Sequence, residues 1–359
     1  MTYEYFFKSD IYSNIIFSIN AKVINMKNKT YAKIENKDKL ELLITELPNI
    51  NDNEVSIKVI NCGICHSDIS AIDNAWNLSK FPLVAGHEII GEVISIGKNV
   101  KNHNVGDIVG LGWHSGYCHN CEYCKNDDFN FCVKTKKTIY SQTGGFAEFV
   151  NADSTAVIPI PKGMDLDKIG PLLCGGITVF TPIIEFNIKK NDKVGVIGIG
   201  GLGHLAIKFL KAIGCDVTAF SSSPEKKNGI LLMGANEVIQ SNDDETLKKY
   251  NDRFDFIIST VNRKLNWNRY LECLKPRGRL HMVGATLDAL DVSVFNLMKG
   301  RKSISGSPVG SPKNIVKMLE FVKKHQTYPD VEIFRFDSIN EAISKLRKNE
   351  IRFRAVVKW

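Results

Sequence analysis

Four cysteines in one short polar segment carry the clearest chemical signal of the sequence. They follow the spacing C-x2-C-x2-C-x7-C and are Cys118, Cys121, Cys124 and Cys132. Four thiolates this close together suit a tetrahedral zinc ion with no position left for a substrate, and such an ion stabilises a loop that has few apolar side chains. An iron–sulfur cluster is the alternative, but the run lacks the C-x2-C-x2-C-x3-C-P form and a second cysteine group nearby. The pattern therefore predicts a structural zinc site.

A second set of metal-binding side chains is scattered over three segments. Cys65 lies in NCGICHSDI, His87 and Glu88 lie in FPLVAGHEIIG, and Cys174 lies in PLLCGGITVF. Each residue alone is a weak signal, because single cysteines and histidines are usually packing or hydrogen-bonding residues. Two thiolates and one imidazole, however, leave a fourth zinc position open, where the oxygen of an alcohol or aldehyde can bind and exchange. Together with the nucleotide motif described next, the set predicts a catalytic zinc.

Three glycines form a nucleotide-binding motif. Gly198, Gly200 and Gly203 spell G-x-G-x-x-G directly after a predicted strand and before a predicted helix. In this context the glycines let the backbone approach a pyrophosphate at the N-terminus of the helix. The motif therefore predicts a bound dinucleotide.

The end of the following strand indicates which dinucleotide binds. NAD-binding proteins usually carry an acidic residue about 20 residues after the motif, for the ribose 2′-hydroxyl. Here the strand ends in hydroxyl and basic residues, namely Ser221, Ser222, Ser223, Lys226 and Lys227. These groups suit a 2′-phosphate that a carboxylate would repel, so we predict NADP. Glu225 lies in the same turn, and a solvated turn without a ligand is the alternative.

Two other patterns compete for the cysteines. Cys62, Cys65 and His66 spell C-x-x-C-H, the form of covalent haem attachment, and C-x-x-C is also a redox motif. Haem attachment in most settings needs export, whereas the chain opens without a basic start or a sustained apolar stretch. The redox alternative lacks a thioredoxin-like βαβ pattern around it. We therefore expect Cys62, Cys215 and Cys273 to be buried structural thiols.

The composition excludes several classes of protein. With 359 residues, 43% hydrophobic and 24% charged, the chain has the balance of a globular protein of about two domains. Nine cysteines are too few for a secreted disulfide scaffold and cannot all pair, which favours the reducing cytoplasm. The net charge of +8 is spread without a basic run, so we expect no nucleic-acid partner. No apolar run approaches the roughly 20 residues of a membrane span, so we expect no membrane insertion.

The elements that must position these residues are of two types. Alternating apolar and polar residues from Val55 to Val59, followed by further short strands and frequent glycines, predict a β-rich first half. From about residue 190, strands alternate with helical patterns, as in a parallel sheet covered by helices. The predicted fold class is α/β, with an N-terminal extension at 1–25, a catalytic domain at 26–174 and 313–359, and a cofactor domain at 175–312.

Several longer phrases resemble those of a known family. CGICHSDI, AGHEIIGEVISIGKNV, VGDIVGLG, PLLCGGITVF, VIGIGGLGHLAIKF and SISGSPVGS occur in this order. From about Met26 to its end the chain resembles the zinc-dependent medium-chain dehydrogenases, and most of all their NADP-dependent cinnamyl-alcohol-dehydrogenase type. The resemblance implies a GroES-like β-rich catalytic domain interrupted by a Rossmann-fold parallel-sheet domain. It also implies two zinc ions per chain, one catalytic and one structural, and a homodimer.

The same resemblance implies roles for individual residues. Cys65, His87 and Cys174 would hold the catalytic zinc, Glu88 would enter its shell during ligand exchange, and Ser67 would be the hydroxyl beside the substrate oxygen. The implied cofactor-binding residues are Thr178, Gly198, Gly200, Gly201, Leu202, Gly203, Ser221, Ser222, Lys226, Thr260, Gly284 and Ser307.

Two positions depart from the family pattern. Ser70 stands where close relatives place a histidine, which leaves His66, the cofactor ribose or water as the outer end of the proton path. Lys137 stands about where an aromatic lines the pocket of relatives that bind phenylpropenyl alcohols, while Trp76 and Trp113 are expected pocket walls. The family's type substrate is therefore not transferred to this chain.

These residues together predict reversible interconversion of a primary alcohol and an aldehyde, with Ser67 passing a proton to or from the substrate oxygen. Three alternatives stay open at this point. An enzyme of the same fold could act on secondary alcohols or polyols. A non-catalytic protein could bind NADP as a sensor. A nucleic-acid-binding protein could use the four-cysteine loop as a zinc knuckle.

Overall fold

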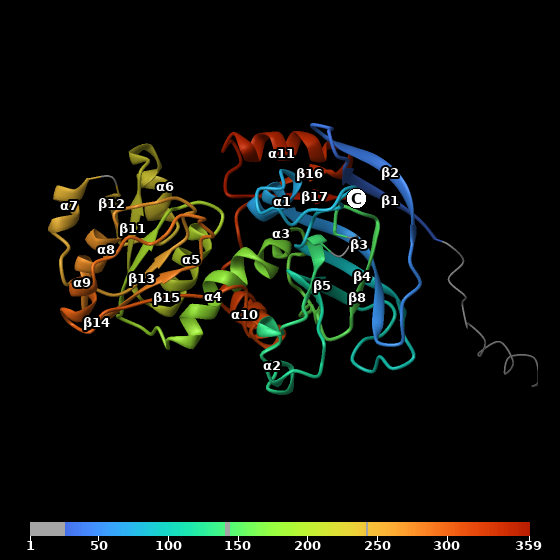
Figure 1. Ribbon diagram of the computed structural model, residues 1–359, viewed down its shortest axis with the longest axis horizontal. Coiled ribbons are helices and arrows are strands. Elements are labelled where there is room, and N and C mark those ends of the chain that lie inside the picture. Colours follow the sequence, from blue (N-terminus) through green and yellow to red (C-terminus); the bar gives the residue numbers. More distant parts are fainter. Residues whose placement is uncertain (1–25, 141–143, 242) are drawn as a thin grey trace, which may run out of the picture.

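Two large β-sheets lie side by side, with helices over and between them (Figure 1). The computed structural model describes residues 26–140, 144–241 and 243–359. The predicted N-terminal extension, residues 1–25, lies outside the described residues. One sheet is wholly parallel and the other is mostly antiparallel, as the two textures of the sequence predicted.

The parallel sheet belongs to the region that was predicted to bind the cofactor, and it is called the cofactor part below. Its strand order is β12-β11-β10-β13-β14-β15. Because the order reverses at β10, whose neighbours are β11 and β13, a crevice opens at the carboxyl ends of these strands. The strands are β10 (Lys193–Ile197), β11 (Asp216–Ser221), β12 (Glu237–Gln240), β13 (Phe254–Ser259), β14 (Leu274–Met282) and β15 (Ser303–Gly306).

Helices connect these strands, and α5 (Gly203–Ile213) shows why they form. Its residues Leu205, Phe209 and Leu210 are buried at helical spacing, and each contributes about 1.5–3 kcal/mol of apolar burial. The helix ends at Gly214, whose φ of 95° favours glycine. The other helices here are α6 (Lys227–Leu232), α7 (Asp244–Lys248), α8 (Trp267–Cys273) and α9 (Val294–Met298), with a 3-10 turn η4 (Pro224–Lys226).

The mixed sheet combines strands that come before and after the parallel sheet in the sequence. Its order is β16-β17-β3-β4-β5-β9, and β8 also pairs with β3. β17 is antiparallel to β3, with Val356 opposite Gly63, so the last strand completes a sheet that begins before the cofactor part. The strands are β3 (Glu54–Ile64), β4 (Ile89–Ile96), β5 (Ile108–Leu111), β8 (Phe149–Asp153), β9 (Val157–Pro159), β16 (Val331–Arg335) and β17 (Arg354–Lys358).

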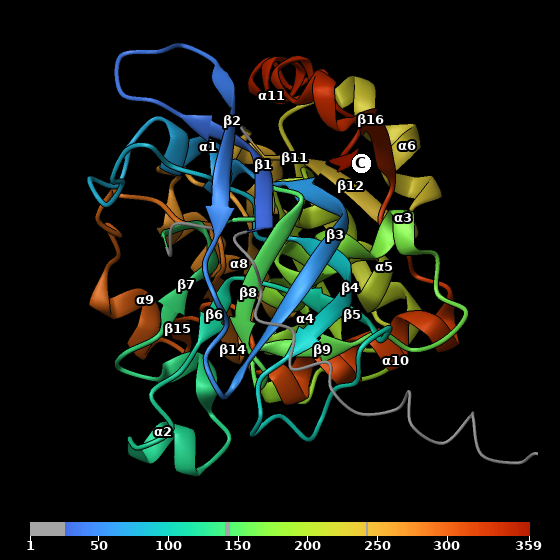
Figure 2. The same ribbon diagram turned by 90° about the vertical axis from the view of Figure 1, so that its right-hand side faces the viewer.

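Smaller elements surround the mixed sheet. The β1–β2 hairpin lies on its outer side, away from the parallel sheet, and α2 lies on a loop that extends from its lower edge (Figures 1 and 2). These elements are β1 (Met26–Lys33), β2 (Leu40–Leu47), β6 (His114–Gly116), β7 (Lys136–Lys137), α1 (His66–Ile72), α2 (Glu122–Lys125), α3 (Leu166–Ile169) and α11 (Ile339–Arg347), and the 3-10 turns η1 (Phe129–Phe131), η2 (Thr138–Tyr140), η3 (Gly170–Leu173) and η5 (Phe336–Ser338).

Two helices, α4 (Gly175–Glu185) and α10 (Pro312–His325), lie between the sheets (Figure 1). Ile177 and Met318 are buried in one hydrophobic core with Val194 of β10, so these helices pack against the cofactor part. The predicted domain boundaries beside them stay a prediction. Among the described residues no single helix is long and apolar enough to cross a membrane, and Leu166–Leu173 with Gly175–Glu185 meets that criterion only as a pair bent by 60°.

Candidate active site

A cavity of about 780 Å³ opens between the two parts of the fold. Its walls include Cys65 and Cys174 of the scattered metal-binding set. They also include Gly198 and Gly200 of the nucleotide motif and Ser221 at the end of β11. The structure therefore brings the metal-binding set and the dinucleotide motif, which lie far apart in the sequence, to one space of ligand-binding size.

The scattered metal-binding set converges on one point. Cys65 precedes α1, Cys174 precedes α4 and His87 precedes β4, and all three side chains are buried. His87 Nε2 lies 3.1 Å from Cys174 Sγ, and the two Sγ atoms are 4.0 Å apart. Neighbouring donor atoms of a tetrahedral zinc site lie about 3.5–3.8 Å apart, given Zn–S of about 2.3 Å and Zn–N of about 2.0 Å. The two distances lie within about 0.5 Å of this range and the donor types are those of a zinc site, so the set fits zinc.

A buried carboxylate that our sequence analysis missed orients this set. Asp68 accepts hydrogen bonds from the backbone N–H of Cys65 and of Gly86, each at 2.8 Å, and lies 2.9 Å from His87 Nδ1. Because Nδ1 faces the Asp68 carboxylate, the Nε2 atom of His87 points toward the two thiols. Burial alone would lower the pKa of His87, but the Asp68 charge raises it well above its usual value. The available signal was the position of Asp68 three residues after Cys65.

A buried ion pair borders the metal-binding set on the side of the nucleotide motif. Glu88 Oε1 accepts a hydrogen bond from Arg354 Nη2, and both side chains are almost wholly inaccessible to solvent. Glu88 Oε2 has no hydrogen-bond partner among the described residues, so it is a buried acceptor within reach of the metal-binding atoms. Burial raises the pKa of Glu88 to about 7, against the opposing charge of Arg354. Our sequence analysis missed Arg354, because an arginine before the apolar run Ala355–Val357 carries no local signal.

The expected substrate side of the cavity is built mainly by α1 and two tryptophans. Ser67 and Ser70 are half-buried and line the cavity, as does the exposed His66. Trp113 packs edge-on against His87 with ring centroids 5.0 Å apart. Trp76 lies against Trp113 at 6.4 Å, so both tryptophans form the predicted wall.

Lys137 does not take the place expected for it. It lies in the two-residue strand β7, paired with His114 of β6, and is not among the residues that line the cavity. The short stretch after Cys132 folds back onto β6, where Lys137 lies opposite His114. The sequence spacing alone placed Lys137 wrongly, because it could not reveal this pairing.

The nucleotide motif forms the turn between β10 and α5. Gly198 has a φ of 83°, and a Cβ at Gly203 would lie 2.0 Å from the Gly198 carbonyl oxygen, so both positions need glycine. A Cβ at Gly200 would meet nothing within 4 Å, which leaves open space over the turn for a phosphate group. All the predicted cofactor-binding residues except Gly203 line the cavity: Thr178, Gly198, Gly200, Gly201, Leu202, Ser221, Ser222, Lys226, Thr260, Gly284 and Ser307.

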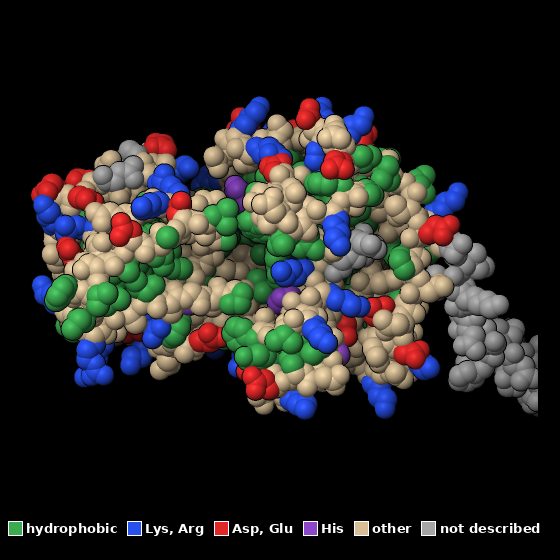
Figure 3. Space-filling model, in the orientation of Figure 1, with side chains coloured by type: hydrophobic (Ala, Val, Ile, Leu, Met, Phe, Trp, Pro, Cys, Tyr) green, Lys and Arg blue, Asp and Glu red, His purple; other side chains and the backbone are tan. Residues whose placement is uncertain are grey.

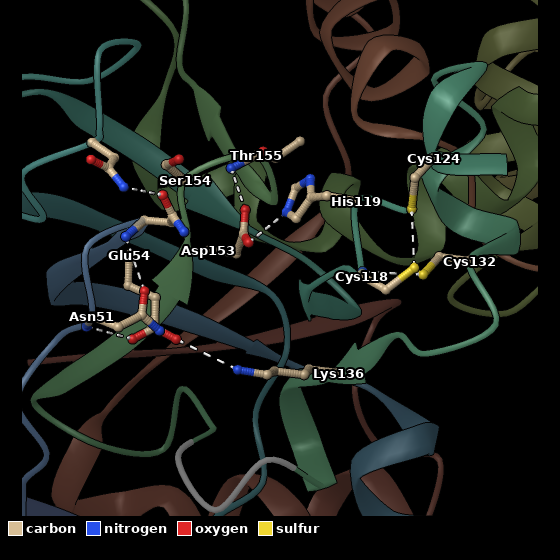
Figure 4. Close-up of polar contacts among 12 residues, drawn as sticks. Asn51, Glu54, Cys118, His119, Cys124, Cys132, Lys136, Asp153, Ser154 and Thr155 are labelled. Atoms are coloured by element: carbon tan, nitrogen blue, oxygen red, sulfur yellow. Dashed lines mark hydrogen bonds and ion pairs between the residues drawn. The ribbon is translucent and has the colours of Figure 1, made fainter. Parts of the chain in front are cut away.

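The four-cysteine loop forms a separate metal-binding cluster, in which Cys118, Cys124 and Cys132 point toward one another (Figure 4). Cys118 Sγ lies 3.9 Å from Cys124 Sγ, and Cys121 Sγ lies 3.5 Å from Cys124 Sγ. Backbone N–H groups of Asn120 and Cys121 lower the pKa of Cys118 to about 6, which favours the thiolate. These donors fit a closed tetrahedral zinc site.

The remaining cysteines behave as expected. Cys62, Cys215 and Cys273 are buried, and burial raises the pKa of each thiol. Cys62 lies in β3 beside the backbone of Gly63, away from Cys65. These thiols therefore fill apolar space in the structure rather than joining either cluster.

Comparison with known proteins identifies the family. The family model described as Alcohol dehydrogenase GroES-like domain matches residues 51–162, and the one described as Zinc-binding dehydrogenase matches residues 201–324. Aldehyde reductase AdhA of Synechocystis is 48% identical over 92% of this chain and 98% of its own length.

Two solved structures share the whole architecture. Cinnamyl alcohol dehydrogenase SbCAD4 of Sorghum bicolor has a TM-score of 0.89 and 33% identity, covering 93% of this chain and 98% of its own. Cinnamyl alcohol dehydrogenase of Helicobacter pylori, in complex with NADP(H), has a TM-score of 0.86 and 30% identity, covering 93% and 99%. The predicted fold of a GroES-like domain with a Rossmann domain is thus confirmed, and this chain belongs to the zinc-binding alcohol dehydrogenases, oxidoreductases of CH–OH groups.

Proposed function

We propose that this protein reduces aldehydes to primary alcohols with NADPH, and oxidises such alcohols with NADP, at the cavity between its two parts. The single observation that carries the proposal is that two members of the buried metal-binding set, Cys65 and Cys174, line the same cavity as the glycine turn. A zinc ion held by these three residues would supply Lewis-acid polarisation of the substrate oxygen, and NADPH would supply the hydride. The chain's own side chains would transfer the proton and exclude water, as the next paragraph describes.

Ser67 is the proposed proton-transfer group. Ser67 lies on α1 two residues after Cys65, and it lines the cavity together with Cys65 and Cys174. It can donate a proton to the substrate oxygen during reduction and accept one during oxidation. His66 and Ser70 line the same stretch of cavity, so either side chain or water can return the proton to solvent. Trp76 and Trp113 would exclude water from the reacting carbon.

The cofactor preference follows from the end of β11. Ser221 is buried, Ser222 is exposed, and both line the cavity together with Lys226. Glu225, the acidic residue that weakened the prediction of NADP, is not among the lining residues. Exposed Arg263, which the sequence analysis did not single out, lines the cavity and adds positive charge. Hydroxyls and cations without a lining carboxylate at this turn favour the 2′-phosphate of NADP. The complex of the H. pylori relative with NADP(H) supports the same preference.

A homodimer and a cytoplasmic location are further parts of the proposal. β15 is an edge strand of the parallel sheet, and apolar side chains gather over neighbouring α9 (Figure 3). Val294, Phe295 and Met298 of α9 are each more than 60% exposed. Such a patch beside an open sheet edge suits a second copy of the chain. All nine cysteines are unpaired, which supports a reducing compartment. Light scattering after size exclusion tests the dimer.

Steady-state kinetics tests the proposed reaction. We expect NADPH oxidation with aliphatic or aromatic aldehydes. Turnover of ketones and sugars should be slower, because the proposed products are primary alcohols. Ser222→Asp should shift the preference between NADPH and NADH at least about tenfold toward NADH, because a carboxylate repels the 2′-phosphate. Lys190→Gln is the control, since it changes the charge equally at an exposed residue that does not line the cavity. Equal ratios in Ser222→Asp and wild type would contradict the cofactor assignment, and faster ketone reduction would favour the secondary-alcohol alternative.

A further inference from the structure

Phe353 has an unusual backbone conformation just outside the metal-binding set. It lies between α11 and β17, and its φ is 98°. A large side chain is strained at such an angle, so the conformation persists only where the surroundings hold it in place. Phe353 also lines the cavity, directly before Arg354. The contacts that hold Phe353 therefore bear on the site.

The Phe353 ring stacks on the ring of His204 of α5. The two rings stack with centroids 4.7 Å apart and an angle of 13° between their planes. His204 is fully buried and its Nδ1 lies 3.1 Å from the Gly200 carbonyl oxygen, so the ring is fixed to the glycine turn. Burial lowers the pKa of His204 to about 3, so the stacked ring is neutral. The stack thus connects the cofactor helix to the last strand of the mixed sheet.

The next residue along the chain extends this connection to the metal-binding set. Arg354 pairs with Glu88, and a Cβ added at Gly201 would lie only 2.9 Å from Arg354 Nη1. Its guanidinium therefore fills the space between the carboxylate and the glycine turn. A shift of the backbone at Phe353 would move Arg354 relative to Glu88 and to the glycine turn. The reason is that Phe353 directly precedes Arg354, which begins β17.

We propose that His204 and Phe353 are positioning residues for the reaction, whose stack holds Arg354 between Glu88 and the dinucleotide turn. The inference rests on the proposed use of a dinucleotide at this turn. It predicts that loss of the stack weakens cofactor binding more than it slows the chemical step, since neither ring lies in the metal-binding set. An ordinary packing contact would instead affect only the stability of the fold.

A second contact of α5 provides a matched control. Lys208 lies one helical turn after His204, and its Nζ is 2.6 Å from Asp330 Oδ1 and 2.9 Å from the Tyr328 carbonyl oxygen. This contact also joins α5 to the chain near β16, but none of its three residues lines the cavity. Lys208→Met therefore removes a contact between α5 and the chain near β16 without changing the residues that surround Phe353.

The experiment compares Phe353→Ala, Phe353→Tyr and Lys208→Met as zinc-loaded full-length proteins. In Phe353→Ala we expect the Kd and KM for NADPH to rise about five- to tenfold, as for loss of one aromatic stack, and kcat to stay within about twofold. Phe353→Tyr keeps the stack and should match the wild type. Lys208→Met should lower only the melting temperature. Kd is measured by fluorescence titration with NADPH and, in parallel, with NADH. The effect of losing the stack can then be measured even if the protein prefers NADH.

Phe353→Gly separates the stack from the backbone strain. Glycine adopts positive φ without strain, so the cofactor-free Phe353→Gly protein should melt at or above the temperature of Phe353→Ala, while both bind NADPH weakly. The proposal is overturned if Phe353→Ala binds both dinucleotides as the wild type does, or if Lys208→Met weakens binding equally. Absence of dinucleotide binding by the wild type would also overturn it, whereas binding without aldehyde reduction would contradict only the proposed reaction.

Discussion

The two metal-binding clusters differ in how the chain brings their ligands together. Residues 118–132 supply all four thiols of the loop cluster, two of which are partly exposed. The cavity cluster takes Cys65, His87 and Cys174 from segments before α1, β4 and α4, and all three side chains are buried. The closed loop cluster is thus built by one short segment. The cavity cluster, which has an open position, forms only when the segments before α1, β4 and α4 pack together.

Their surroundings differ in the same way. In the loop, the backbone N–H groups of Cys118 and Lys134 donate hydrogen bonds to Cys132 Sγ, with N–Sγ distances of 3.4 Å, so the loop backbone itself orients this ligand. In the cavity, distant charged residues surround the ligands: Asp68 orients His87, and Arg354 pairs with Glu88. The chemistry of the cavity cluster can therefore be changed without altering a ligand, while the loop cluster depends mainly on its own cysteines.

Removal of one cavity ligand should have the largest effect. In Cys174→Ala two protein ligands of the proposed set remain, so turnover should fall at least about 10³-fold. Metal analysis should show zinc decreasing from two ions per chain to one, and circular dichroism should show a retained fold because the loop cluster is intact. Turnover close to the wild-type rate would rule out the zinc assignment of this cluster.

Removal of one loop ligand should affect stability instead. We expect Cys121→Ser to lose the other zinc ion and to melt about 5–10 °C lower, because zinc binding contributes to folding of the loop. The kcat of protein that remains folded should stay within about tenfold of wild type. Proteolysis within residues 118–132 reports the loosened loop. An unchanged melting temperature with abolished turnover would show that the clusters have the opposite roles.

A residue that touches no metal should still affect the cavity cluster. Asp68→Asn keeps the shape but loses the charge facing His87 Nδ1, so zinc affinity should fall about 10- to 100-fold in competition with a chelator. Asp73→Asn is the control, because Asp73 follows the same helix but pairs with surface residue Arg347. If both variants hold zinc as tightly as wild type, Asp68 does not support the ligand set.

The contact that attaches the loop to the mixed sheet should matter least. His119 Nε2 lies 2.8 Å from Asp153 Oδ2, with the histidine 44% exposed, and Lys136 reaches Glu54 (Figure 4). Surface ion pairs contribute about 0–1 kcal/mol. Asp153→Asn should therefore lower the melting temperature by less than about 2 °C and leave zinc content unchanged. A decrease comparable to that of Cys121→Ser would show that docking, rather than metal, stabilises the loop.

Much of the fold and both ligand sets could be predicted because their signals are local or belong to familiar phrases. The four-cysteine spacing, the glycine turn after β10 and the hydroxyl run at the end of β11 each lie within a few residues. Asp68, His204 and Phe353 were missed because Gly86 comes next to Asp68, and the rings of His204 and Phe353 come together, only on folding. The position of Lys137 was predicted wrongly for the related reason that the pairing of β7 with β6 cannot be read from the spacing of the sequence.

The sequence by itself determined the chemical types: a closed thiolate loop, an open set of two thiolates and an imidazole, and a dinucleotide turn. Only the tertiary structure decided which charges face them. β17 returns to pair with β3, and this return places Arg354 between Glu88 and Gly201. Local spacing specifies which ligands a segment can offer. Burial and charge depend on which distant segments pack around it, and these determine how the ligands can react.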